Sequence, residues 1–173
     1  MILYHGTNLK SAQAIYKNQT VDVSVGSTSV DFGPGFYTTN DLKTAEKWAI
    51  LKGLTRHDKS AVLLLDFDYE KAEPFIEFFS DDLRWGRFLV NNRNGLKYIS
   101  NVAFKEHNLD RRYHITYGRI ADYELITIAE DLYKNAQMLR SIDKIWNKKF
   151  SMQYVFHTKF ALQFLDNIRY TVL

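Results

Sequence analysis

The chain has 173 residues, of which 46% are hydrophobic and 15% aromatic, and this composition excludes a disordered or fibrous protein. It contains no cysteine, which excludes a disulfide framework, a thiolate metal site and a cysteine nucleophile. The net charge of +3 permits a polyanionic partner but does not predict one.

The first residues, Met-Ile-Leu-Tyr-His-Gly, carry neither a basic leader nor a long apolar run. No apolar run long enough to span a membrane occurs elsewhere in the sequence. We therefore expect a single domain over residues 1–173 that is cytoplasmic and has no membrane partner.

Strands and helices are expected in turn through the first third of the chain. Residues 1–5 predict a strand, and Asn8 can cap the helix that follows it. Residues 18–35 have no helical period and predict a loop that ends in a Gly-Pro-Gly turn. A strand is expected at 36–39, followed by a helix to about residue 55 that Asn40 or Asp41 caps.

The rest of the chain mixes further strands and helices. Residues 61–67 form a dense apolar run that predicts a central strand. After it we expect, in chain order, a helix at 81–93, a strand at 113–117, helices at 120–134 and 137–146, a strand at 153–156, a helix at 158–166 and a strand at 170–173. Strict alternation of strand and helix is missing, which favours an α+β fold over a doubly wound parallel sheet.

Three segments far apart in the sequence carry the residues best suited to chemistry: Tyr4-His5-Gly6-Thr7, the turn and strand at 33–39, and Met152-Gln153-Tyr154-Val155. The imidazole of His5 can bond a sugar hydroxyl, and the bare backbone of Gly6 can approach a planar amide. Tyr37 can lie against a flat heterocycle, with Trp48 as the opposite wall of the slot.

The order of these segments resembles the catalytic domain of diphtheria toxin and its ADP-ribosyltransferase relatives. The whole chain is similar to a bacterial branch of that superfamily, the DUF3990 family. Four stretches carry this similarity: Asp-Phe-Gly-Pro-Gly-Phe-Tyr-Thr-Thr at 31–39, Trp-x-x-Phe-x-Val-x-Asn-Arg at 85–93, Tyr-x-Ile-x-x-Gly-x-Ile-Ala-Asp at 113–122 and Gln-x-x-Phe-His-Thr-x-x-Ala-Leu at 153–162.

The resemblance implies a split β-sandwich core of the ADP-ribosyltransferase type with surrounding helices. It implies an enzyme of the glycosyltransferase class that transfers one ADP-ribose from NAD+, its co-substrate, without a metal. His5, Tyr37 and Gln153 would be the catalytic residues. The residues that would bind NAD+ are Gly6, Thr7, Gly35, Phe36 and Trp48. His5 would bond the adenosine-side ribose and Gly6 the nicotinamide carboxamide, while Tyr37 and Trp48 would stack on the nicotinamide.

The resemblance further implies a toxin of a toxin–antitoxin or anti-phage defence system, with an antitoxin protein as partner. The acceptor would be RNA, single-stranded DNA or protein. Many relatives have a glutamate where this chain has Gln153. An amide can orient a ribose hydroxyl but supplies neither a negative charge nor a base. An acidic helper could come from Asp31 or Asp122.

The same residues also admit structural roles. His5 could make a local hydrogen bond, Tyr37 and Trp48 could be core aromatics, and Gln153 could be a polar group at a strand edge. The remaining histidines lack the spacing of a metal site, and His157 is expected to point to solvent or backbone. Two alternative functions remain open: a module that binds NAD+ or another nucleotide without transfer, and an RNA-binding protein without nucleotide chemistry.

Overall fold

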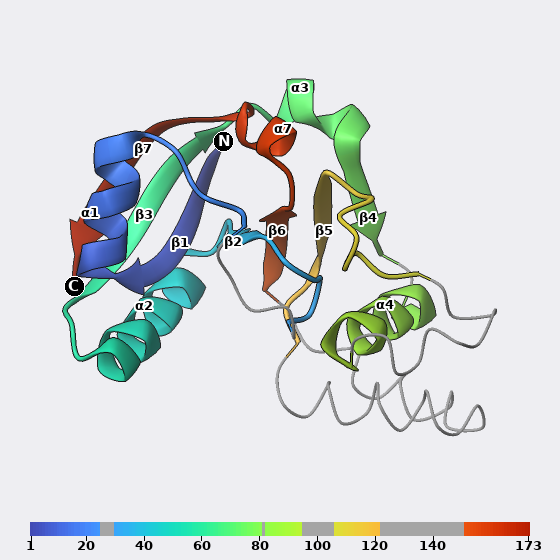
Figure 1. The fold of residues 1–173 in the computed structure, drawn as a ribbon, viewed down its shortest axis with the longest axis horizontal. Helices are drawn as coiled ribbons and strands as arrows, with labels where there is room; N and C mark the ends of the chain where they lie inside the picture. Colours follow the sequence, from blue (N-terminus) through green and yellow to red (C-terminus); the bar gives the residue numbers. More distant parts are fainter. Residues whose placement is uncertain (25–29, 81, 95–105, 122–150) are drawn as a thin grey trace.

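A computed structural model describes residues 1–24, 30–80, 82–94, 106–121 and 151–173 (Figure 1). The fold is α+β, as predicted, with one seven-stranded sheet in the order β4-β5-β6-β2-β1-β3-β7. The strands are β1 (Ile2–Asn8), β2 (Phe36–Thr39), β3 (Ser60–Phe67), β4 (Ile76–Phe79), β5 (Ile115–Arg119), β6 (Met152–Phe156) and β7 (Leu165–Val172). The described helices are α1 (Leu9–Asn18), α2 (Leu42–Arg56), α3 (Tyr69–Ala72), the 3₁₀ turn η1 (Glu73–Phe75), α4 (Asp82–Asn94) and α7 (Lys159–Leu162).

Strand β1 is paired very differently on its two sides. It pairs with β3 along its whole length, from Ile2↔Asp66 to Asn8↔Ser60. With β2, the register within the described residues contains one pair, Tyr4↔Thr39. The sheet therefore has two halves, β1-β3-β7 and β2-β6-β5-β4, which are inclined to each other in Figure 1. We call the opening between β1 and β2 beyond Tyr4↔Thr39 the fork.

Both faces of the sheet bury apolar side chains. Leu3, Leu63 and Leu65 lie on one face, in a core cluster that also contains Ala12 of α1 and Ala161 of α7. On the opposite face, Val62 packs against Ala45 and Ala49 of α2. The aromatic side chains of Phe79 and Phe88 form another cluster where α4 meets the second half of the sheet. The two helices α2 and α4 thus cover separate halves of the same face (Figure 1).

The predicted caps of the first two helices are present. The Asn8 side chain accepts a hydrogen bond from the backbone N–H of Ser11, and the Asp41 side chain accepts one from that of Lys43. Helix α2 lies directly on the backbone of β1. A Cβ atom on Gly6 would lie 2.0 Å from the Ala45 carbonyl oxygen and 2.5 Å from the Ala49 nitrogen. Only glycine fits at position 6 without moving the helix.

The prediction of a helix over residues 158–166 is wrong beyond Leu162. Leu165 and Asp166 belong to β7, because they pair with Phe67 and Asp66 of β3. Strand β4 was not predicted; it lies at the edge of the sheet and pairs parallel to β5. Residues 122–134 and 137–146 of the two other predicted helices lie outside the described residues. No helix in the described ranges is both long and apolar enough to cross a membrane.

Candidate functional site

The backbone of Gly6 faces the fork. Met1 and Phe67 exchange two hydrogen bonds of 2.8 and 2.7 Å, so they form a hydrogen-bonded pair of the β1–β3 ladder. Such pairs alternate with unbonded ones in an antiparallel ladder, so the even-numbered residues of β1 direct their N–H and C=O groups toward β2. Tyr4 uses these groups in its pair with Thr39. Gly6 presents its own N–H and C=O to the fork, where the register has ended.

The imidazole of His5 bridges the fork to the backbone of β2. In a continued ladder Tyr37 would be opposite Gly6, but its carbonyl oxygen lies 2.6 Å from His5 Nδ1 instead. A carbonyl can only accept, so Nδ1 carries the proton and Nε2 is left as an acceptor. Burial lowers the pKa of His5 to about 4, opposed by this hydrogen bond and aided by the charge of Lys52, so the ring is neutral near pH 7.

The three predicted catalytic residues lie on adjacent strands but not on one face. Residues directly opposite each other share a face of the sheet, and the pairs Tyr37↔Val155 and Thr39↔Gln153 place Tyr37 and Gln153 on the α2 side, with Gly6. His5 directly precedes Gly6 in the strand, so its side chain points to the opposite face of the sheet. The centroid of its ring lies 4.4 Å from that of Phe36. A ligand that touches all three residues must therefore enter the fork between the strands.

The hydroxyl group of Tyr37 is fixed by the preceding turn. It accepts a hydrogen bond of 3.0 Å from the Phe32 N–H and donates one of 2.8 Å to the Gly33 carbonyl. Burial raises the pKa of Tyr37 above its usual value, so the phenol keeps its proton. Tyr37 can offer its ring to a ligand but cannot act as a base.

The amide of Gln153 is oriented by its neighbours. Gln153 is 5% exposed, and its Nε2 donates to the Arg119 carbonyl at 3.4 Å. The amide also lies near enough to the Asp31 carboxylate to lower the pKa of that group. Since the Arg119 carbonyl is an acceptor, the nitrogen faces it and Oε1 is the atom that can accept from a ligand. In this orientation the amide offers the same kind of acceptor atom as a glutamate would, without the charge.

Asp31, one of the two predicted acidic helpers, does lie beside Gln153. Arg93 donates from Nε to Asp31 Oδ1 at 2.6 Å and forms an ion pair with it, and the Ala121 N–H donates to Oδ2 at 3.3 Å. Burial raises the pKa of Asp31, and the charge of Arg93 opposes this shift. Both oxygens of the carboxylate thus already accept hydrogen bonds from the protein. The other predicted helper, Asp122, lies outside the described residues.

The sequence reasoning did not select Arg93. It is the last residue of the Trp-x-x-Phe-x-Val-x-Asn-Arg stretch, so the signal was present, but its partner is 62 residues away. Only the tertiary fold identifies this ion pair.

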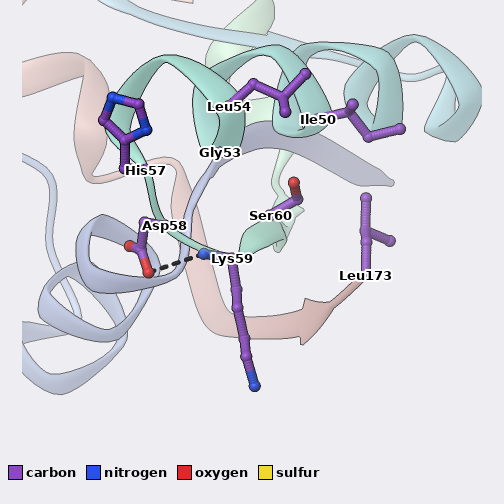
Figure 2. A pocket seen from close by; sticks show the side chains of 8 residues that line it. All are labelled: Ile50, Gly53, Leu54, His57, Asp58, Lys59, Ser60 and Leu173. Atoms are coloured by element: carbon purple, nitrogen blue, oxygen red, sulfur yellow. Dashed lines mark hydrogen bonds between the residues drawn. The ribbon is translucent and has the colours of Figure 1, made fainter.

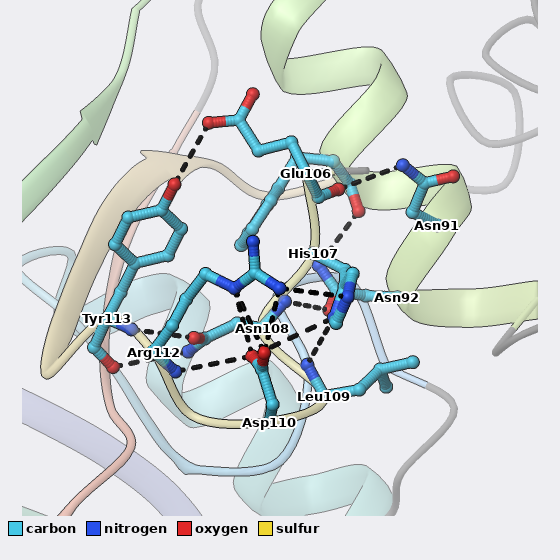
Figure 3. A network of polar contacts seen from close by, with 10 residues as sticks. Asn91, Asn92, Glu106, His107, Asn108, Leu109, Asp110, Arg112 and Tyr113 are labelled. Carbon is cyan, nitrogen blue, oxygen red and sulfur yellow. Dashed lines mark hydrogen bonds and ion pairs between the residues drawn. The ribbon is translucent and has the colours of Figure 1, made fainter. Parts of the chain in front are cut away.

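The turn that carries Asp31 and Gly33 packs against a network of polar contacts (Figure 3). Asn92 Oδ1 accepts from the Asn108 N–H at 2.8 Å, and Asn108 Oδ1 accepts from the Tyr113 N–H at 2.9 Å. A Cβ atom on Gly33, whose φ is +83°, would lie 2.9 Å from the same Asn92 oxygen. This network therefore fixes the position of the turn at Asp31 and Gly33. The turn itself carries Asp31 and accepts the hydrogen bond from the Tyr37 hydroxyl.

The predicted NAD+-binding residues differ in exposure. Thr7 and Phe36 are 7% and 5% exposed, and a Cβ on Gly35 would lie 2.8 Å from His157 Nδ1. Trp48 is 46% exposed, and its Cβ atom would lie 2.9 Å from a Cβ atom on Gly6. Only Trp48 of this group offers a large free surface, and the binding roles of all of them, Gly6 included, stay predictions.

His157 is fully buried and bonds to the backbone, not to solvent. Its Nδ1 donates to the Pro34 carbonyl at 2.8 Å, and its Nε2 accepts from the Thr116 hydroxyl at 2.8 Å. Burial lowers its pKa to about 4. Among the described residues, no group of three or more histidine, aspartate and glutamate side chains is arranged to hold a metal ion.

A family model described as "Protein of unknown function (DUF3990)" matches residues 1–167. No curated protein and no solved structure matches the chain. Because the matched region covers almost the whole sequence, the chain belongs to the DUF3990 family.

Proposed function

We propose that this protein is a mono-ADP-ribosyltransferase with an ADP-ribosyltransferase-like split sandwich, and that NAD+ binds in the fork. The observation that carries the proposal is the early end of the β1–β2 ladder. It directs the N–H and C=O groups of Gly6 into the fork. A primary carboxamide, such as that of nicotinamide, offers the matching carbonyl acceptor and NH₂ donor.

The neighbouring side chains complete this site. His5 Nε2 would accept a hydrogen bond from a ribose hydroxyl, because Nδ1 is already engaged with the Tyr37 carbonyl. Tyr37 and the exposed Trp48 would enclose the nicotinamide ring. Gln153 would accept from the hydroxyl of the nicotinamide ribose through Oε1. The charge of Lys52 lowers the pKa of His5. The same charge would also attract the diphosphate of NAD+.

In the proposed reaction the glycosidic bond of NAD+ breaks and its electron pair leaves with nicotinamide. A nucleophile of the acceptor then forms the new bond to the same ribose carbon and loses its proton. The site gains rate from contacts that strengthen as the ribosyl cation forms. Asp31 is held by Arg93 and serves here to orient Gln153.

The resemblance alone supports the wider role that we propose, an intracellular toxin restrained by an antitoxin protein. The acceptor is RNA, single-stranded DNA or protein. The neutral amide at Gln153 favours one competing function, a module that binds NAD+ without transferring ADP-ribose.

Labelled NAD+ tests the proposal directly. The purified protein is incubated with it and with cell RNA, single-stranded DNA or protein, and released nicotinamide and label on each acceptor are measured. We expect His5→Ala to lower nicotinamide release at least about tenfold, in line with the loss of a positioned polar group. The matched control is His57→Asn, at an exposed histidine beyond the end of α2; it should leave the rate unchanged.

Two results separate the alternatives. Wild-type protein that binds NAD+ but neither releases nicotinamide nor labels an acceptor is a binding module. Protein that shows no NAD+ binding and whose RNA affinity does not respond to NAD+ contradicts the proposal altogether.

A further inference from the structure

Helix α2 exposes several large apolar side chains on its outer side. Ala45, Ala49 and Gly53 are buried against the strands. The large apolar residues on the rest of the helix are exposed: Trp48 by 46%, Ile50 by 50%, Leu51 by 47% and Leu54 by 70%. Large apolar side chains that gather on one exposed surface of a protein mark a site of interaction. The outer face of α2 therefore has the composition of a surface that another molecule covers.

Beside the helix lies an open hollow lined by both apolar and polar residues. Figure 2 shows Ile50 and Leu54 of α2 on one side of it and Leu173, which follows β7, on the other. Leu173 is 48% exposed and is held by a 3.0 Å hydrogen bond from its N–H to the Ser60 carbonyl. We call Ile50, Leu51, Leu54 and Leu173 the α2 patch; Trp48, on the flank of α2 next to Gly6, is left to the fork.

The α2 patch is surrounded mainly by positive charge. The exposed cations on and just after α2 are Lys43, Lys47, Lys52, Arg56 and Lys59, against the single acidic residue Glu46 on the helix itself. Within the described chain none of these cations forms an ion pair with another residue. Asp58, at the rim of the hollow, accepts from the backbone N–H groups of Lys10 and Lys59. A molecule that binds the α2 patch should therefore carry acidic groups.

We propose that the α2 patch binds an acidic amphipathic helix of a partner protein. Leucine-like side chains spaced at i, i+3, i+4 and i+7 would contact Ile50, Leu51 and Leu54 and enter the hollow beside Leu173. Glutamate and aspartate on the flanks would pair with the surrounding lysines. A second copy of this chain does not fit as occupant, because two such basic patches repel each other. The inference does not depend on the proposed NAD+ chemistry.

The test is an NMR titration of the full-length, isotope-labelled protein with a synthetic helical peptide of this acidic pattern. We expect shifts in the amide signals of α2 and Leu173, and an affinity that falls as salt is added. A peptide of the same composition in scrambled order should bind at least about tenfold more weakly, since its apolar residues no longer share one face.

Variants at exposed positions locate the surface without threatening the fold. Leu54→Glu should weaken the peptide at least about tenfold, as expected for an apolar residue at the centre of an interface. Lys47→Glu should also weaken it, because it replaces attraction to an acidic flank of the peptide by repulsion. Lys17→Glu, a matched change on exposed α1, should leave binding intact.

Three outcomes overturn the proposal. One is the absence of shifts at the α2 patch, and another is equal binding of the scrambled peptide. The third is binding of phosphatidylserine vesicles or single-stranded oligonucleotide, in place of the peptide, through the same residues; this would make the patch a membrane or nucleic-acid surface.

Discussion

The histidine at the fork and the histidine after β6 are held in the same way but are left with different atoms to offer. Each donates Nδ1–H to a backbone carbonyl, Tyr37 for His5 and Pro34 for His157, and burial lowers both pKa values to about 4. The Nε2 atom of His157 accepts from Thr116, whereas that of His5 has no partner in the part of the chain described. One imidazole is complete as a structural group; the other retains an acceptor for a ligand.

Replacing each histidine by alanine gives the largest contrast. His157→Ala leaves a cavity and two buried groups without partners, so we expect the free energy of unfolding to fall by about 3–5 kcal/mol. His5→Ala, at a half-buried site, should cost about 1–2 kcal/mol. Urea unfolding measures both. Equal losses would mean that His5, too, is mainly structural.

Acid should destabilise the protein through both histidines, and a variant separates their contributions. A histidine whose pKa is lower in the folded than in the unfolded protein binds its proton more readily in the unfolded state. Its contribution to the free energy of unfolding is therefore complete above about pH 6.5 and is lost as the pH falls toward 4. For His157 the difference between 6.5 and about 4 corresponds to roughly 3 kcal/mol. Urea unfolding across this range measures the loss. His157→Asn, which can still donate to the Pro34 carbonyl, should lack this part of the pH dependence and keep the part due to His5.

Thr116→Val is the mildest of these changes. It removes the hydroxyl that donates to His157 Nε2 and keeps a similar shape, so we expect a loss of about 1–2 kcal/mol in unfolding experiments. The NMR signals of the His157 ring should shift while those of the His5 ring stay in place. Shifts of similar size at both rings would show that the two sites are coupled.

Much of the fold could be predicted locally. Asn8 and Asp41 mark helix starts by their side-chain chemistry. The apolar run at 61–67 is an internal strand, next to the edge strand β7, and both faces of the sheet are covered there. Local patterns failed where pairing decided the structure. Leu165 and Asp166 continue a helical pattern, but their partners on β3 draw them into a strand. The edge strand β4 is only four residues long and gave no usable period.

The site followed the same division. Residue types and their order selected His5, Gly6, Tyr37 and Gln153, because each side chain or bare backbone suits a chemical task by itself. The order of strands, which inserts β2 between β1 and β6, could not be deduced from those segments. The register of the strands places the side chains of His5 and Tyr37 on opposite faces of the sheet. The tertiary fold also brings Asp31 into contact with Arg93. Such features depend on contacts between residues far apart in the chain.

The contact between α2 and Gly6 links the two surfaces described above. With no side chain at position 6, the backbones of helix and strand touch, and no layer of flexible side chains lies between them to absorb movement. Helix α2 and strand β1 therefore form one rigid unit at this point, and a movement of either backbone requires a movement of the other.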